Sequence, residues 1–365
     1  MTRISVIIPS YNHEPFIAEA IRSVLAQSYS DLELIIVDDH STDGSLNVID
    51  TIADPRIHRL FLERNVGGAA ALNTGIRISR GDYVALCNSD DAWHPDKLRR
   101  QVEILDTHPE IAAVFSDVDW IDGAGAPLDS RFNWLKGTFT TPNRSSGSWI
   151  RHLVEHGNCL CHPSILIRRS VYDKIGFYNT WLRQLPDLEM WLRLLSRHTI
   201  FVMADRLVRF RWHDRNASRP SRSTSRRSIN EYRLIVRSLF DRIDAETFGA
   251  AFGWLAEDED GGAKALTWEK ALYLMACEGP HENVLRQLGW EYAAEMLLPL
   301  PSELPTFVAE RFDPFVFQEQ LSTFSPWLRT WLSESSPVAI GNPGTVATIR
   351  RLLTAVARRI KSRFR

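Results

Sequence analysis

The first hundred residues alternate between short apolar runs and segments whose apolar positions repeat every three or four residues. Such runs are typical of strands buried on both faces, and such repeats are typical of amphipathic helices. We predict strands over 4–10, 32–39, 57–63 and 83–87, and helices over 14–28, 45–53 and 68–79. This βαβα order predicts a mostly parallel sheet with helices on both faces.

The alternation continues less regularly to about residue 211 and then stops. We predict strands over 112–122, from Ser164 and over about 200–211, a short helix closed by Gly176, and a helix that starts at Pro186. Long helical stretches follow from about 228. The chain therefore divides into an α/β domain over 1–225 and an α-helical accessory region over 226–365.

The last stretch, 345–365, puts apolar residues on one side and seven arginines and lysines among the rest. A basic amphipathic helix of this type can lie on an anionic bilayer. Docking on its own domain explains the pattern equally well.

Polar residues gather where the predicted strands end: Pro9 to Asn12 after the first, Asp38 and Asp39 after the second, and Asn88 to Asp91 after the fourth. In parallel sheets, ligands bind beyond the carboxyl ends of the strands. We therefore expect one ligand site at this edge of the sheet.

Composition narrows the class of protein. The 365 residues are 44% hydrophobic and 24% charged, as in globular proteins, and the net charge of −2 gives no electrostatic case for a nucleic-acid partner. The 4 cysteines form no paired framework, which favours a reducing compartment. The start of the chain lacks the apolar core of a signal peptide, and no apolar run reaches the roughly 20 residues that span a bilayer. We expect a cytoplasmic protein, either free or peripheral on the cytosolic side of a membrane.

The loop after the first strand, "PSYNHEP", contains no glycine, and the chain has neither a dinucleotide-binding G-x-G-x-x-G nor a P-loop in the expected place. A polyphosphate must then be held in another way. Mg²⁺ usually takes one or two protein carboxylates together with phosphate oxygens, so Asp90 and Asp91 are candidates to share a cation with such a ligand. The alternative is that the two acids only stabilise the start of the next helix.

Four stretches, "ISVIIPSYNHEPFIAEAIRSVLAQSYSDLELIIVDDHSTDGS", "NVGGAAALNTGI", "GDYVALCNSDD" and "PDLEMWLRL", resemble the family 2 glycosyltransferases of the GT-A fold in order and spacing. The resemblance covers about residues 1–215. It implies an inverting glycosyltransferase that uses a nucleoside-diphosphate sugar, usually with Mg²⁺ or Mn²⁺.

The resemblance also implies roles for individual residues. Pro9 and Tyr11 would line the nucleoside pocket with Tyr11 stacked on the base, and Asp39 would accept a hydrogen bond from the base imide, which favours uracil or thymine. Asp90 would face the ribose or sugar, Asp91 the metal, and Asn73 would belong to the nucleotide-binding set. His213 could be a further metal ligand or a phosphate donor. One departure is Leu72, where the family often carries an arginine before the asparagine.

Other interpretations of these residues stay open. Tyr11 could be a partly buried core residue, and Asp38 could cap the turn that follows it. His213 could be structural. The arginines of the serine-rich stretch 215–227 could clamp a diphosphate or a phosphate-bearing acceptor from a mobile loop, or belong to a solvated linker.

Asp187 resembles the catalytic base of the family. At a helix start it would be stabilised as the anion, hence available but weak. Glu189 is the rival base, and a helix N-cap is the structural alternative for Asp187.

We therefore expect transfer of a sugar from a UDP- or dTDP-sugar to a hydroxyl of a glycan or lipid-linked acceptor, as in polysaccharide biosynthesis of the cell envelope. The alternative is a non-catalytic sugar-nucleotide-binding protein whose helical region is an interaction module. A sugar nucleotidyltransferase would need a glycine-rich loop after the first strand, which this chain lacks.

Overall fold

The short apolar runs form strands of one eight-stranded sheet in the computed structural model, which describes residues 2–253 and 263–297. The strand order is β3-β2-β1-β4-β7-β6-β8-β5. The strands are β1 (Ile4–Ser10), β2 (Leu32–Asp38), β3 (Ile57–Phe61), β4 (Tyr83–Leu86), β5 (Ala92–Trp93), β6 (Ile111–Ile121), β7 (Leu166–Arg168) and β8 (Thr199–Arg211). The pairs β1–β2, β1–β4, β2–β3 and β6–β8 are parallel. This confirms the prediction of a mostly parallel sheet, with β7 and β5 as antiparallel exceptions.

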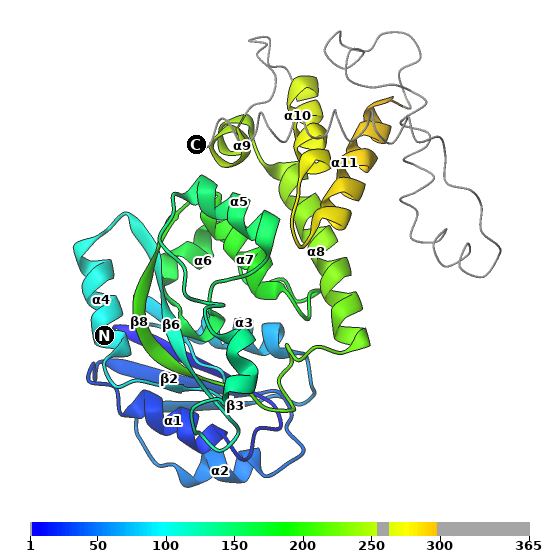
Figure 1. The fold of residues 1–365 in the computed structure, drawn as a ribbon. Helices are drawn as coiled ribbons and strands as arrows, with labels where there is room; N and C mark the ends of the chain where they lie inside the picture. The colour runs from blue at the N-terminus through cyan, green and yellow to red at the C-terminus, as the bar shows by residue number, and fades with distance from the viewer. Residues whose placement is uncertain (1, 254–262, 298–365) are drawn as a thin grey trace, which may run out of the picture. The chain divides into compact units, whose positions relative to one another are not determined.

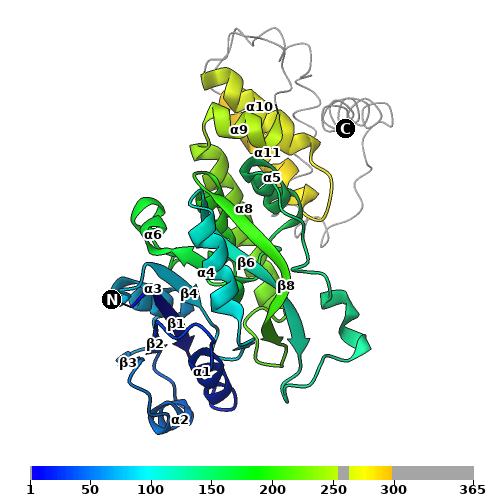
Figure 2. The ribbon, with the colours of Figure 1, turned by 90° about the vertical axis from the view of Figure 1, so that its left-hand side faces the viewer.

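Helices cover both faces of the β1–β4 half, as the alternation predicts. One face of β1 and β2 packs in a single core with α1 (Ile17–Leu25), α2 (Ser45–Thr51) and α4 (Lys97–Thr107). On the opposite face, Gly75 of α3 (Gly68–Ile78) lies against Ile7 and Val37. Figures 1 and 2 show β6 and β8 as long neighbours that curve away from this half.

The remaining elements before residue 222 are η1 (Ser130–Leu135), α5 (Ser146–His156), η2 (His162–Ser164), α6 (Arg169–Ile175) and α7 (Pro186–Leu195). The first helix begins at Ile17, later than the predicted residue 14, because Pro15 lies in a turn that precedes it. The serine-rich stretch is not a loop throughout: α8 (Arg222–Arg242) begins inside it, so this part of the loop prediction is wrong.

The chain forms two compact units. The first comprises the residues up to Leu153 together with Asn158–Ile235, and the second begins at Val236 and includes Val154–Gly157. The boundary predicted at 225 falls within α8. In the second unit, Phe240, Phe252 and Tyr273 form an aromatic core between α8, α9 (Ala245–Phe252) and α10 (Ala263–Ala276). Gly289 lets α11 (Glu282–Leu297) approach Ala271 and Met275 of α10. The basic helix predicted over 345–365 lies outside the described residues.

Gly81 shows where close backbone packing requires glycine. A Cβ at this position would lie 2.6 Å from the backbone nitrogen of Ser5 and 2.9 Å from the carbonyl oxygen of Arg3. Gly81→Ala should therefore lower the free energy of unfolding by about 1–3 kcal/mol, the usual cost of overpacking. Urea denaturation measures this, with Gly68→Ala as control because a Cβ there meets nothing within 4 Å. Equal midpoints for the two variants would contradict the prediction.

Candidate active site

The carboxyl ends of β1, β2 and β4 bring the predicted nucleoside-binding residues to one edge. Ser10 and Asp38 are paired at the ends of β1 and β2, and the Asp39 amide donates to the Ser10 carbonyl at 2.8 Å. Pro9 is half-buried within β1, whereas Tyr11, just beyond it, is 45% exposed. Tyr11 is therefore not a core residue in this structure, and its ring is accessible to a ligand.

The two adjacent acids after β2 have different environments. Asp38 is fully buried and accepts hydrogen bonds from the Ser41 amide and hydroxyl, both at 2.7 Å, which confirms that it caps the turn. Asp39 is also buried, and its carboxylate accepts from the amides of Val66 and Gly67 at 2.6 and 2.8 Å. Asp39 thus fixes the loop before α3. Its contact with a base imide stays a prediction.

Asn73 occupies a structural position. Its buried side-chain amide donates to the Tyr178 carbonyl at 2.8 Å and accepts from the Tyr178 amide at 2.9 Å. Both ends of the amide are thereby used to tie α3 to the segment after α6. The neighbouring Leu72, the departure from the family pattern, is buried in the core.

A compact group of ligand atoms surrounds Asp90. The Nε2 atoms of His213 and His13 lie 3.1 and 4.0 Å from Asp90 Oδ2, and Asn216 donates to the same oxygen at 3.3 Å. One ligand atom each from His13, Asp90 and His213 lies within 4.8 Å of the other two. The group joins the ends of β1, β4 and β8, three segments distant in sequence.

These residues fit a divalent metal by their chemistry. Imidazole and carboxylate are ligands that Mn²⁺ accepts, and a ligating histidine usually has its second ring nitrogen fixed by a hydrogen bond. The Ser89 hydroxyl lies 2.7 Å from Nδ1 of His13, which directs Nε2 toward Asp90. Burial lowers the pKa of His13 and so favours the neutral, ligating form.

Asp91, which we expected to bind the metal, accepts hydrogen bonds from protein groups instead. It is buried, and its two oxygens accept from the Arg211 amide at 2.7 Å and from the Asn88 side chain at 2.9 Å. Burial, and next the charge of Asp90, raise the pKa of Asp91 well above its ordinary value. Among the described residues the geometry favours Asp90 over Asp91 as the carboxylate of a metal site.

Arg211 organises the same region from the end of β8. Its buried guanidinium donates to the Asp90 carbonyl at 2.7 Å, forms an ion pair with Glu19 of α1, and lies over the Phe16 ring. Arg211 thus fixes the backbone at Asp90 and links it to α1.

Asp187 lies at the second position of α7, as predicted, and is half-buried. It accepts from the Asn158 side chain at 2.7 Å and from the Leu188 amide at 2.8 Å. The low pKa expected from the helix start is not what the structure indicates: burial outweighs these hydrogen bonds and raises the pKa of Asp187 to about 6. A carboxylate of this kind is ionised at neutral pH and more basic than an ordinary aspartate.

The rival Glu189 points away from this position. It is buried and paired with Arg193 through two hydrogen bonds of 2.7 and 2.8 Å, and Arg193 also donates to the Phe177 carbonyl. Both carboxylate oxygens of Glu189 are thus engaged by Arg193. Glu189 therefore stabilises α7.

Glu231 of α8 supports the start of α7. Its buried carboxylate accepts hydrogen bonds from three successive amides, those of residues 183, 184 and 185, at 2.8–2.9 Å. The charge of Glu231 also contributes to the raised pKa of Asp187. Sequence reasoning assigned no role to Glu231, His13, Ser89 or Asn158. His13 and Ser89 lie just past strand ends, within stretches that resemble the family, which is a usable signal. Glu231 and Asn158 carry no such signal.

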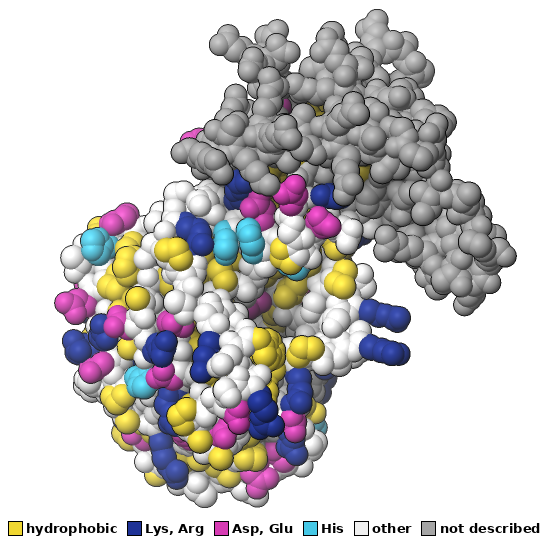
Figure 3. All heavy atoms as spheres, viewed as in Figure 1, with side chains coloured by type: hydrophobic (Ala, Val, Ile, Leu, Met, Phe, Trp, Pro, Cys, Tyr) yellow, Lys and Arg dark blue, Asp and Glu magenta, His cyan; other side chains and the backbone are white. Residues whose placement is uncertain are grey.

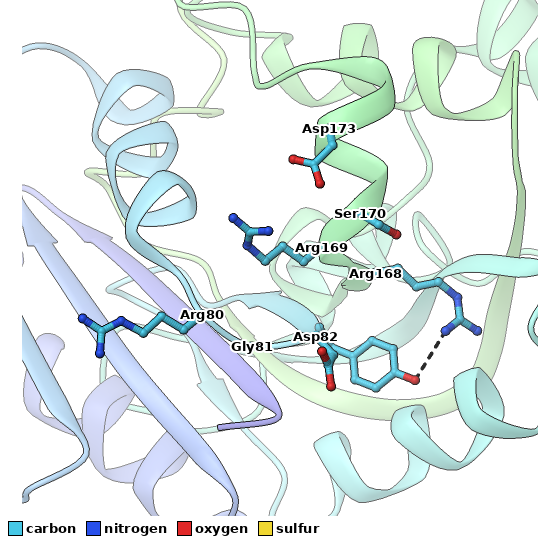
Figure 4. A pocket seen from close by; sticks show the side chains of 8 residues that line it. Arg80, Gly81, Asp82, Arg168, Arg169, Ser170 and Asp173 are labelled. Carbon is cyan, nitrogen blue, oxygen red and sulfur yellow. Dashed lines mark hydrogen bonds between the residues drawn. The ribbon is translucent and has the colours of Figure 1, made fainter. Parts of the chain in front are cut away.

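A separate cavity of about 450 Å³ lies at the opposite, amino end of β4. Arg80 and Asp82 line one side and Arg169 and Asp173 of α6 the other, as Figure 4 shows. Parallel sheets bind ligands at the other end of the strands, and the lining includes none of the predicted site residues. Figure 3 likewise shows basic and acidic side chains interspersed on the face in view, without a large patch of one sign.

Comparisons with known proteins show the family of the chain. A sequence model of glycosyl transferase family 2 matches residues 5–176. TuaG of Bacillus subtilis, named as a teichuronic acid biosynthesis glycosyltransferase, is 33% identical over 240 residues, which are 65% of this chain and 90% of TuaG. The chain belongs to glycosyl transferase family 2.

Further similarities extend this assignment. EpsE of Bacillus subtilis, also named as a glycosyltransferase, is 32% identical to this family 2 glycosyltransferase over 53% of the chain and 67% of EpsE. The structure of Staphylococcus aureus TarS residues 1–349 with UDP-GlcNAc superposes with a TM-score of 0.54 at 18% identity, over 80% of this chain and 87% of that one. This likeness confirms the GT-A fold. Among the described residues, no helix has the length and apolar character to cross a membrane.

Proposed function

We propose that this glycosyltransferase transfers a sugar from a UDP- or dTDP-sugar to a hydroxyl of a glycan or lipid-linked acceptor, with inversion at the anomeric carbon. The observation that carries the proposal is Asp187, a half-buried carboxylate with a pKa raised to about 6 on the helix that the family resemblance marks as catalytic. Family membership favours an enzyme over a non-catalytic binder.

In the proposed reaction, Asp187 takes the proton of the acceptor hydroxyl while the hydroxyl oxygen of the acceptor bonds to the anomeric carbon. The bond between that carbon and the diphosphate oxygen breaks, and the nucleoside diphosphate leaves with the electron pair. A single displacement of this kind inverts the anomeric centre. Asn158 and the Leu188 amide hold the carboxylate in place for this step.

Tyr11, Pro9 and Asp39 would receive the nucleoside, since they lie together at the ends of β1 and β2. Stacking of a base on an exposed aromatic ring is worth about 1–3 kcal/mol. Asp90 with His13 and His213 would hold Mg²⁺ or Mn²⁺, which when bound supplies positive charge to the leaving diphosphate. The name of TuaG, a teichuronic acid biosynthesis glycosyltransferase, supports polysaccharide biosynthesis as the setting. Peripheral contact with a membrane rests on the basic stretch 345–365 and stays a prediction.

A screen of UDP-glucose, UDP-galactose, UDP-GlcNAc and dTDP-rhamnose with p-nitrophenyl glycosides as acceptors tests this function. We expect transfer with at least one donor and a product of inverted configuration, which NMR of the new linkage determines. A product that keeps the donor's configuration would rule out direct displacement.

Glu231→Gln should lower kcat up to about 10-fold, because one amide oxygen then replaces a carboxylate that orders the three amides before Asp187. Removal of the charge should also lower the pKa of Asp187, so the acid limb of the kcat/KM profile should move to lower pH. Glu246→Gln, at an exposed position of α9, is the matched control. An unshifted acid limb in Glu231→Gln would contradict the electrostatic part of this argument.

A further inference from the structure

Five aromatic residues form a connected cluster at the ends of β6 and β8, which we call the aromatic platform: Trp120, Trp134, Phe139, Phe210 and Trp212. Trp120 stacks on Phe139 with ring centroids 5.5 Å apart and contacts Phe210 at 4.8 Å. Trp212 contacts Trp120 at 6.4 Å and Trp134 at 5.8 Å. The platform is continuous from the sheet to the surface.

The inner part of the platform is anchored and the outer part is accessible. Trp120, Phe139 and Phe210 pack against the hydrophobic core. Trp134 is 62% exposed and meets the half-buried Trp212 edge to face, at 87°. Within the platform, the Trp134 indole is thus left in water, whereas Trp120, Phe139 and Phe210 are packed against the core.

The segment that carries Trp134 is ordered by its own contacts. Leu135 next to it is buried, and the Thr140 hydroxyl donates to Asp117 of β6 at 2.7 Å. The Asp129 side chain accepts from the Arg131 amide at 2.9 Å and caps η1. The exposed ring is thus held in a defined position, which reduces the entropy cost of binding.

The platform adjoins the Asp90 group. Trp212 directly precedes His213, so their Cα atoms are about 3.8 Å apart, and His213 Nε2 lies 3.1 Å from Asp90. The platform therefore borders the Asp90 group from the end of β8, next to His213.

We propose that Trp134 and Trp212 form a subsite for a pyranose ring of the acceptor glycan; this rests on the proposed glycosyl transfer. A pyranose presents a face of C–H groups that suits the electron-rich face of an indole. Charged groups lie on the segment that carries Trp134: Arg131 precedes it by three residues in η1 and lies 3.5 Å from Asp129. Such a polar border suits sugar hydroxyls better than a lipid chain.

Steady-state kinetics of Trp134→Ala test the subsite, with the p-nitrophenyl glycoside that serves in the donor screen and its methyl glycoside, which lacks a second aromatic ring. We expect the acceptor KM to rise about 5- to 10-fold with both glycosides and the donor KM to change less than 2-fold. Trp134→Phe, which keeps an aromatic face, should recover most of the loss. Ile78→Ala, at an exposed apolar position at the end of α3, should change neither KM.

Four results would overturn the subsite. A rise of the donor KM alone would place Trp134 on the donor side. A loss seen with octyl glycosides but not with methyl glycosides would indicate a lipid contact, and a change of oligomeric mass in sedimentation would indicate a second copy of the chain. If wild type transfers to no glycoside, tryptophan fluorescence still decides. A saturable change on addition of methyl glycosides, whose half-saturating concentration rises about 5- to 10-fold in Trp134→Ala but not in Trp134→Phe, keeps the subsite while the transfer proposal fails. No change in wild type rejects the subsite.

Discussion

Replacement of Asp187 by asparagine should lower the rate of sugar transfer by about 10²-fold or more, the scale of a lost general base. The asparagine keeps the shape and one acceptor oxygen for the Leu188 amide, so α7 should start unchanged. Donor binding should persist, because the nucleoside residues and the Asp90 group lie on other strand ends. Single-turnover rates measure the first effect, and calorimetry with UDP measures the second.

Controls separate this role from the structure around it. Asp173→Asn, at an exposed position of α6, should leave transfer unchanged. Glu189→Gln should reduce the stability of the protein through the loss of the Arg193 pair rather than remove the base. Full activity in Asp187→Asn, together with a rate loss in a folded Glu189→Gln, would move the role to Glu189.

The same carboxylate predicts a pH dependence. Activity that requires ionised Asp187 should fall as the pH drops through about 6. Because the folded pKa lies above the ordinary value of 3.8, ionisation is disfavoured in the folded state, and this cost is present above pH 6. The free energy of unfolding of wild type should therefore be roughly 1 kcal/mol higher at pH 5 than at pH 7 through this group. Asp187→Asn should lack that gain in urea titrations at the two pH values.

Strands, helix starts and the edge of the sheet could be predicted from the sequence because each depends on residues that are near one another in the chain. The apolar runs of β1 and β2 are buried on both faces, and Pro186 opens α7 at the predicted place. Because parallel strands end at one edge, the position of Asp39 and Asp90 beyond their strands was enough to predict that they belong to one edge of the sheet. The fold class followed from the same order of elements.

The features that sequence reasoning missed depend on contacts between distant segments. Glu231 meets the amides before α7 from 46 to 48 residues away. A lysine in a helix is usually exposed, yet Lys97 of α4 is fully buried. Its ammonium group donates to Gln101 at 2.9 Å and lies 3.9 Å from the Trp93 ring centroid. The raised pKa of Asp187 arises from burial, which a helix-dipole argument does not contain.

The assignment within the Asp90–Asp91 pair illustrates the same limit. Adjacent acids cannot be ranked as metal ligands from sequence, because the ranking depends on which oxygens are already used. Here the Arg211 amide and Asn88 take both oxygens of Asp91, whereas Asp90 faces two imidazoles. The assignment of the metal to Asp90 is therefore our revised proposal.

Replacement of Asp90 by asparagine should weaken Mn²⁺-dependent UDP binding by at least about 100-fold, because the only carboxylate of the three-residue ligand group is lost. Asp91→Asn should change it far less, since the asparagine can still accept the Arg211 amide bond. Ser89→Ala should weaken the Mn²⁺-dependent binding of UDP about 10-fold, because the His13 ring then loses the hydrogen bond that fixes its orientation. Calorimetric titration of UDP with and without Mn²⁺ measures all three, and unfolding curves show whether each variant is folded. The reverse order, with Mn²⁺ dependence lost in Asp91→Asn and kept in Asp90→Asn, would return the metal to Asp91 and require the Arg211 amide to leave it on binding.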